Sequence, residues 1–385
     1  MKKIYFDNSA TTPICQESLE EMAKVSLDIY GNPSSLHGLG LQGEKGKEKN
    51  RKVIAEILKV KDREIFFTSG GTESNNLAIK GIARRNLKRG KHIITTSIEH
   101  PATLFSCQAL EREGFQVDYL GVNNEGIISL KELQDKIRDD TLLVSIMHVN
   151  NEIGAIMPLE KIGKIIKAKN PATFFHVDAV QSFCKLPCLP KSWQADLLSI
   201  SSHKIHGPKG IGALYIREKT LIEPLFHGGG QEVGIRPGTE NTPAIAGFAK
   251  AAAKYYALRS DNFAKVKELR NLFLEKVLAE IPEVKVNSSN SSAPYILNLS
   301  FAGVKGEVLL HTLKKDGIFV STGSACHSKK QELSHVLVAL GLENEDIEGA
   351  LRFSFSPHNT KEEIEFTVEK LKTGVENLRK FRDRL

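Results

Sequence analysis

Short apolar runs alternate with amphipathic stretches along the first two thirds of the chain. The runs have the length of buried strands, and most of the stretches between them repeat apolar positions at the spacing of one helix face. The expected strands are residues 64–67, 93–96, 117–120, 142–148, 173–177, 197–200 and 213–216. Strands and helices that alternate in this way predict an α/β domain around a mostly parallel, seven-stranded sheet.

The chain begins differently, with a short extended segment at 4–6 and a polar, turn-forming loop at 7–13. Helical periodicity follows at 17–29 and again in a long charged stretch at 39–59. These two helices precede the first strand of the large domain.

The pattern changes again after a long helical stretch at 243–278, which leads out of the large domain. Beyond it we expect strands at 296–301, 318–321 and 351–356, and helices at 306–316, 333–340 and from 361 onward. This mixture predicts a small α+β domain. We therefore assign residues 14–255 to the large domain, and residues 1–13 and 256–385 to the small one.

Composition narrows the class of protein. The 53 lysines and arginines exceed the 46 acidic residues by seven among 385 residues, but they are scattered along helical stretches, so we expect no direct binding of nucleic acid. No apolar run is long enough to span a bilayer, and the N-terminus reaches an acid before an apolar stretch forms, which predicts a cytoplasmic protein without a membrane partner. Five irregularly spaced cysteines indicate reduced thiols.

Glycines and hydroxyls follow the strand expected at 64–67. Gly70, Gly71 and Thr72 lead from it into an amphipathic helix. Free backbone N–H groups at such a helix N-terminus bind anions. We expect Gly71 and Thr72 to bind a phosphate group; a glycine-rich turn with a threonine cap is the alternative.

Polar side chains also follow the next strands. They are His100, Asn151, Asp178 and Gln181. An aspartate that closes an apolar strand is costly unless a cation or N–H donors meet it, and a protonated pyridine nitrogen is such a cation. Structural roles stay open: His100 can be a satisfied structural residue, and Asp178 can cap the next turn.

Lys204 follows the strand at 197–200, between Ser201, His203 and a sharp turn at Gly207. A lysine in this position is typical of three cases: a solvated surface lysine, a phosphate contact, or a Schiff base with an aldehyde. The residues that follow the strands, taken together, favour the Schiff base among these three cases. They offer partners for the phosphate, ring, ring nitrogen, phenolic oxygen and aldehyde of pyridoxal phosphate, which we therefore expect as the cofactor.

The small domain adds a thiol and a guanidinium. Cys326 lies in a run of small polar residues, an exposed loop in which a reactive thiol can reach a substrate. The spacing of Cys184 and Cys188 is a poor zinc signal. Arg352 lies within an expected strand, where it either grips a substrate carboxylate or forms a structural ion pair.

These motifs resemble the cysteine desulfurases of the NifS/IscS type, which belong to the class V aminotransferase group of fold type I enzymes that use pyridoxal phosphate. The resemblance runs from Tyr5 to about Thr360. It is carried by SGGTESNN at 69–76, EHP at 99–101, HVNNE at 148–152, HVDAVQ at 176–181, SHKIHGPKG at 202–210, RPGTEN at 236–241 and GSAC at 323–326.

The resemblance implies a role for each residue. Lys204 would hold the cofactor as a Schiff base and move protons, His100 would stack on the ring, and Asp178 would pair with the ring nitrogen. The other implied cofactor and substrate contacts are Gln181 on the phenolic oxygen, Gly71, Thr72, Ser201 and His203 on the phosphate, Asn151 at both cofactor and substrate, and Arg352 on the substrate carboxylate. Thr239 would reach the phosphate of a neighbouring subunit, so a homodimer is implied.

The implied reaction converts L-cysteine to L-alanine and leaves the sulfur as a persulfide on Cys326. The sulfur then passes to an acceptor protein such as an iron–sulfur scaffold, or serves the synthesis of another thio-cofactor or the thiolation of tRNA. Cys326 could also serve as a transient cluster ligand. Two departures from the family are Val233, where an arginine is common, and the basic residues after Cys326, which leave the acceptor open. Selenocysteine lyase, a class V aminotransferase and a non-catalytic scaffold of the same fold are the alternatives.

Overall fold

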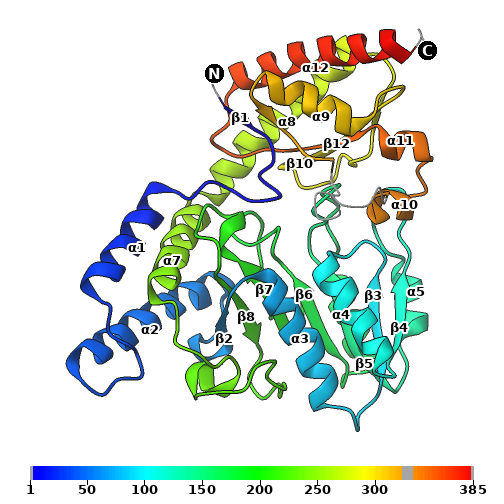
Figure 1. Cartoon of the computed structure of the whole chain (residues 1–385). Coiled ribbons are helices and arrows are strands. Elements are labelled where there is room, and N and C mark those ends of the chain that lie inside the picture. Colours follow the sequence, from blue (N-terminus) through cyan, green and yellow to red (C-terminus); the bar gives the residue numbers. More distant parts are fainter. Residues whose placement is uncertain (1–2, 323–332, 383–385) are drawn as a thin grey trace.

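The computed structural model describes residues 3–322 and 333–382. It has a larger part around a central sheet and a smaller part that holds both ends of the chain (Figure 1). Among the described residues, none of the helices has the length and apolar content needed to cross a bilayer.

Seven strands form the central sheet in the order β2-β8-β7-β6-β5-β3-β4. They are β2 (Ile65–Thr68), β3 (His92–Thr96), β4 (Gln116–Leu120), β5 (Thr141–Met147), β6 (Phe174–Asp178), β7 (Leu197–Ser201) and β8 (Gly212–Ile216). Strand β8 is antiparallel to both neighbours, and the other pairs are parallel. The predicted mostly parallel, seven-stranded sheet is confirmed. Its strands read as continuous apolar runs because all except the edge strand β4 are buried along their whole length.

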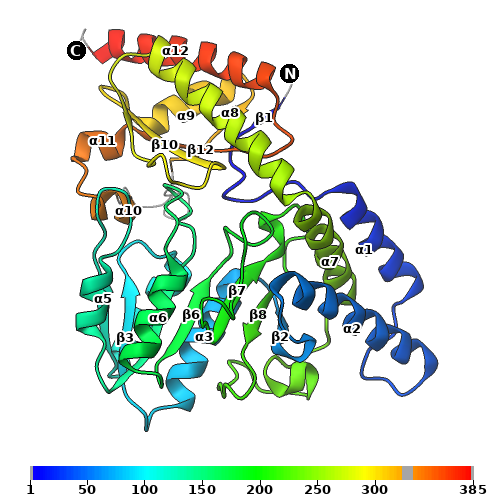
Figure 2. The ribbon, with the colours of Figure 1, turned by 180° about the vertical axis from the view of Figure 1, so that it is seen from behind.

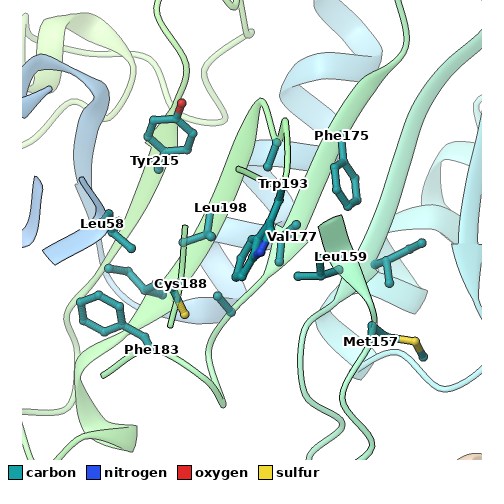
Figure 3. Close-up of a cluster of buried hydrophobic side chains, with 14 of the residues drawn as sticks. Leu58, Met157, Leu159, Phe175, Val177, Phe183, Cys188, Trp193, Leu198 and Tyr215 are labelled. Carbon is teal, nitrogen blue, oxygen red and sulfur yellow. The ribbon is translucent and has the colours of Figure 1, made fainter. Parts of the chain in front are cut away.

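Helices cover both faces of this sheet. They are α3 (Gly71–Arg85) and α4 (Pro101–Arg112) on one face, and α2 (Gly38–Leu58), α5 (Leu130–Lys136), α6 (Leu159–Lys169) and α7 (Thr242–Ala257) on the other. Figure 3 shows part of the hydrophobic core on the face covered by α2, α5, α6 and α7. There Phe175, Val177 and Leu198 from the strands belong to one buried cluster with Trp193 and Leu58. The outer helix α1 (Gln16–Asp28) packs on α7, where Ser18 Oγ donates to the carbonyl of Gly247 at 2.8 Å.

The smaller part is built on the antiparallel sheet β12-β10-β9. Its elements are β9 (Val284–Val286), β10 (Ile296–Phe301), β12 (Ala350–Ser354), α8 (Arg259–Glu280), α9 (Gly306–Lys315), α10 (His335–Ala339), α11 (Asn344–Glu348) and α12 (Lys361–Arg382). The N-terminal strand β1 (Ile4–Tyr5) pairs in parallel with β11 (Ile318–Phe319), so the first residues of the chain lie beside residues more than 300 positions later. Aromatic rings of Phe6, Phe273 and Phe355 pack together in its core.

The structure corrects the sequence prediction at three places. The helix expected at 243–278 is two helices, α7 and α8, with Leu258 between them (Figure 2). Each helix packs in a different part of the molecule, and the turn at Leu258 lets both do so. Strand β9 and helix α11 were not predicted, because each is too short to show a period.

Candidate active site

The predicted site residues gather at one edge of the central sheet. Strands β2, β3, β5, β6 and β7 run in the same direction, so their carboxyl ends lie along this edge. The polar residues that end or follow these strands are Gly71, Thr72, His100, Asn151, Asp178, Gln181, Ser201, His203 and Lys204. This edge is where open α/β sheets bind their ligands.

Lys204 ends the short 3₁₀ turn η2 (Ser202–Lys204), directly after β7. Its Nζ donates to the carbonyls of Ser9 at 2.5 Å and Ala10 at 2.7 Å. The N-terminal loop is held there in turn by Thr12, whose N–H and hydroxyl both donate to the carbonyl of His203. Lys204 is therefore fixed against the N-terminal loop. The two segments are 195 positions apart in the sequence and meet only in the folded chain.

Asp178 is the last residue of β6 and is buried. Its Oδ2 accepts from Asn75 Nδ2 at 2.6 Å, and its Oδ1 accepts from the N–H of Val180 at 2.9 Å. The second bond is the turn cap considered above, and the first links Asp178 to helix α3. Sequence reasoning gave no role to Asn75; its only signal was a polar residue on the buried face of a helix that opens with two glycines.

His100 is the N-cap of α4, and its Nδ1 accepts from the N–H of Ala102 at 3.1 Å. Burial lowers its pKa; the charge of Asp178 opposes this shift, and the charge of Lys204 adds to it. The three side chains therefore lie within electrostatic reach of one another, with the imidazole neutral at physiological pH.

The predicted phosphate site combines two glycines with hydroxyl groups. Gly70 has a φ of +150°, and a Cβ on Gly71 would lie 2.7 Å from Val180 Cγ2, so both positions require glycine. His203 Nδ1 lies 3.1 Å from Thr11 Oγ1, and burial, followed by the charge of Lys204, lowers the pKa of its imidazole to about 3. The predicted site therefore offers backbone N–H groups, hydroxyls and a neutral histidine.

Several buried polar atoms around this edge have no hydrogen-bond partner among residues 3–322 and 333–382. They are Ser9 Oγ, Asn75 Oδ1, Gln181 Oε1, Ser201 Oγ and Arg352 Nε. Native proteins leave few such atoms, so bound water or a ligand is expected to satisfy them. A flat, polar group with a phosphate fits this donor and acceptor set, so the residues present are compatible with pyridoxal phosphate.

Arg352, on β12, links the smaller part of the molecule to the site. Its side chain is 3% exposed, and it donates to the carbonyl of Asn151 at 2.9 Å and to Asp7 Oδ1 at 2.8 Å. The structural ion pair is thus present, and a substrate contact for Arg352 stays a prediction. Asn151 contacts Arg352 through its main-chain carbonyl, and the side chain of Asn151 is partly buried.

Thr239 does not line the cavity that Lys204 lines. It is exposed and borders a separate cavity of about 190 Å³ with Ser69 and Arg236. Val233, on the same loop, is 86% exposed and has a φ of +57°, a strained conformation for a β-branched residue. The loop is held by buried Glu232, which accepts two hydrogen bonds from Arg51.

Cys326 lies in residues 323–332, outside the described residues. Both flanks of this segment are attached close to the site. The N–H of Ser321 donates to the carbonyl of Arg352 at 3.2 Å, and Ser334 Oγ donates to Glu152 Oε2 at 2.6 Å. No cluster of three or more His, Cys, Asp or Glu side chains suited to a metal ion occurs within residues 3–322 and 333–382.

Glu99 is a buried carboxyl group that sequence reasoning did not single out. Its Oε1 accepts from the N–H of Met147 at 2.9 Å and from Thr96 Oγ1 at 2.8 Å, while Oε2 has no partner among the described residues. Burial, with a further contribution from the charge of Asp178, raises its pKa to about 8. Negative charge is thereby concentrated on Asp178, whose oxygens both accept hydrogen bonds.

Replacing Glu99 with glutamine is expected to stabilise the protein more at pH 8 than at pH 5. The folded carboxyl keeps its proton up to about pH 8, whereas the unfolded one loses it near 4.5. Below the unfolded pKa the carboxyl is protonated in both states, so its ionisation does not change the free energy of unfolding. As the pH rises toward the folded pKa, the unfolded state is stabilised by ionisation and the folded protein becomes less stable. The variant should gain roughly 2–4 kcal/mol over the wild type across this interval.

Urea unfolding of wild type and Glu99→Gln at both pH values measures this difference, because other titrations cancel between the two proteins. Glu56→Gln, at an exposed position of α2, is the matched control and should show no pH-dependent difference. An equal difference at pH 5 and pH 8 for Glu99→Gln would contradict the prediction.

Comparison with known proteins gives one consistent result. The family model for class-V aminotransferases matches residues 4–366. Curated relatives named cysteine desulfurase IscS include one from Clostridium botulinum, 46% identical over 373 residues that cover 96% of this chain and 94% of the relative. Another, from Methanosarcina thermophila, is 45% identical over 379 residues, with 98% and 93% covered.

Solved structures agree. A NifS-like protein superposes with a TM-score of 0.92 at 39% identity, covering 97% of this chain and 99% of its own. A structure described as SspA in complex with cysteine has a TM-score of 0.83 at 37% identity, covering 93% and 100%. The chain therefore belongs to the class-V aminotransferase family and, within it, to the cysteine desulfurases of the NifS/IscS type.

Proposed function

We propose that the protein is a cytoplasmic, pyridoxal-phosphate-dependent cysteine desulfurase that takes sulfur from L-cysteine and releases L-alanine. The observation that carries the proposal is the meeting of Lys204, Asp178 and His100 at one sheet edge, surrounded by buried polar atoms that no described residue satisfies. A solved relative in complex with cysteine supports the choice of substrate.

The chain's own residues would hold the cofactor as follows. Lys204 would bind its aldehyde, Asp178 would keep the ring nitrogen protonated, and His100 would stack on the ring. Gln181 would contact the phenolic oxygen, and the phosphate would take donors from Gly71, Thr72, Ser201 and His203. When bound, the cofactor supplies an electron-withdrawing ring that weakens bonds at the substrate's α-carbon.

Substrate binding and sulfur transfer fall to the other residues. Arg352 and Asn151 would hold the substrate carboxylate, for which Arg352 Nε is suited, since it donates to no atom within residues 3–322 and 333–382. The thiolate of Cys326 would bond to the substrate sulfur as the carbon–sulfur bond breaks, which leaves a persulfide on the enzyme. The persulfide sulfur would then pass to an acceptor such as an iron–sulfur scaffold protein, with Cys326 as a transient cluster ligand.

A homodimer belongs to this proposal. Thr239 is exposed and lines a cavity separate from that of Lys204, which suits a residue that serves the phosphate site of a neighbouring subunit. Two copies would then build two composite sites.

An absorption spectrum before and after addition of L-cysteine, with alanine and sulfide assayed in the same tube, tests the proposal. A band of the lysine-bound cofactor that changes with cysteine, together with both products, is the expected result. A band that ignores cysteine would favour a selenocysteine lyase or an aminotransferase. No band, even after pyridoxal phosphate is added, would contradict cofactor-dependent catalysis.

The Cys326→Ser variant is expected to keep the absorption band and to lose sulfide release from cysteine by roughly a factor of 10³ or more, because the hydroxyl does not replace a thiolate nucleophile. Cys15→Ser, at a partly buried thiol before α1, is the control and should keep wild-type turnover. Sustained sulfide release by Cys326→Ser would refute the thiol's role, and sustained turnover of selenocysteine alone would identify a lyase.

A further inference from the structure

A small cavity lies beside Lys204, between the η2 turn and the smaller part of the molecule. Its volume is about 50 Å³, enough for a few water molecules. Two lysines, Lys204 and Lys185, line it together with Arg259 and His206, and none of the described residues that line it is acidic. A cavity with several cations and no anion is electrostatically costly, so its protons are held weakly.

Lys185 has no role in the proposed reaction. It lies in the turn after β6, four residues beyond Gln181, and its Nζ lies 4.7 Å from the centroid of the Tyr295 ring. Within residues 3–322 and 333–382, no carboxylate or carbonyl oxygen accepts a hydrogen bond from this amine. The ring face is therefore the interaction that the structure shows for its charge.

The two amines differ in what stabilises their charged forms. Lys204 donates to two carbonyl groups, whereas the amine of Lys185 lies over the ring and its side chain lines the cavity. Burial, followed by the charge of Lys204, lowers the pKa of Lys185 to about 7. The proton of the pair therefore resides on Lys204 while its amine is docked on the N-terminal loop.

The other titratable groups that face Lys185 do not supply a counter-ion. Burial lowers the pKa of both His203 and His206 to about 3, so these rings are neutral. Burial also raises the pKa of the Cys184 thiol and of the Tyr295 phenol well above their usual values, so both are neutral as well. Arg259 lines the same cavity and brings no carboxylate to it.

We propose that Lys185 and Lys204 share a single proton at neutral pH, and that Lys185 takes the proton that Lys204 must shed to bind the cofactor. Lys204 can attack an aldehyde only as a free amine; its nitrogen then forms the bond to carbon, and the aldehyde oxygen leaves as water. The shed proton stays in the cavity on Lys185, so the net charge of the pair does not change. Lys185 is thus a positioning residue that acts through Lys204. This inference rests on the proposed function, because it takes Lys204 as the cofactor lysine.

The experiment follows the covalent capture of pyridoxal phosphate by the full-length protein freed of cofactor, as a function of pH, through the absorption band of the bound cofactor. Wild type should show a pH midpoint for capture that is set by the proton shared between the two amines. Lys185→Met keeps most of the aliphatic volume and removes the second amine, so the midpoint should rise by about one unit or more and the capture rate at pH 7 should fall roughly tenfold. The ionisation of pyridoxal phosphate itself is common to all samples, so the difference belongs to the protein.

Lys191→Met, which removes an exposed lysine six residues away, is the matched control and should leave the midpoint unchanged. Lys185→Gln is the second variant, for use if Lys185→Met does not fold. An unchanged midpoint in a folded Lys185 variant, or an equal rise in Lys191→Met, would overturn the inference. If wild type formed no band at all, the proposed function would fail instead, so the two failures are distinguishable.

Discussion

Replacing Lys204 with alanine is expected to abolish covalent binding of pyridoxal phosphate and to lower the turnover of L-cysteine by roughly 10⁴-fold or more. Loss of a covalent catalytic group has effects of this size, because the remaining residues still bind the reactants but cannot perform the step. The fold should survive, since Lys204 is only partly buried and its removal frees two carbonyl groups next to a polar site.

The measurements for Lys204→Ala are the absorption band of the bound cofactor, the mass of the protein after borohydride reduction, and the sulfide released. Lys209→Ala is the matched control, because Lys209 is an exposed lysine on the same loop, and it should retain both the band and the activity. A reduced cofactor still attached to the Lys204→Ala chain would show that another lysine is the attachment point.

The second large effect is expected for Asp178→Asn. The carboxylate accepts hydrogen bonds from Asn75 and Val180, and these bonds fix its orientation at the end of β6. Asparagine keeps the shape but cannot balance a positive ring nitrogen. Loss of one member of a buried charge pair costs about 3–5 kcal/mol, which corresponds to a fall in kcat of roughly two to four powers of ten.

Steady-state kinetics of Asp178→Asn should show this loss in kcat, with the cofactor still attached to Lys204. Asn75→Ala is the graded comparison: it removes one donor from an intact Asp178 and should cost less, about tenfold. Asp62→Asn, at an exposed residue, serves as the control for a general loss of negative charge. A change of less than about threefold in Asp178→Asn would show that this carboxylate does not act on the ring nitrogen.

The strands of the central sheet could be predicted from the sequence. Buried strands such as β6 and β7 are continuous apolar runs, because parallel strands covered on both faces tolerate few polar residues. The residue that ends such a run therefore stands out, which is why Asp178, Ser201 and Lys204 could be singled out. The sheet topology then brings these residues together, since parallel strands present their carboxyl ends at one edge.

The contacts that tune these residues could not be predicted from the sequence. Asn75 and Asp178 are 103 positions apart, and Lys204 is 195 positions from Ser9. Arg352 and Asp7 are separated by 345 positions, and their pairing reflects the docking of the first residues onto the smaller part of the molecule. Nothing in the local pattern encodes such pairs, because each partner is chosen by how distant elements pack.

The sequence by itself determined the class of fold, the family and the order of the chemical groups along the sheet edge, because strand periodicity and strand-end residues are local properties. Only the tertiary structure decided which charges these groups carry. Burial raises the pKa of Glu99 to about 8, and burial with the charge of Lys204 lowers the pKa of Lys185 to about 7. Protonation depends on burial and on the neighbouring charges, and both exist only once the chain has folded.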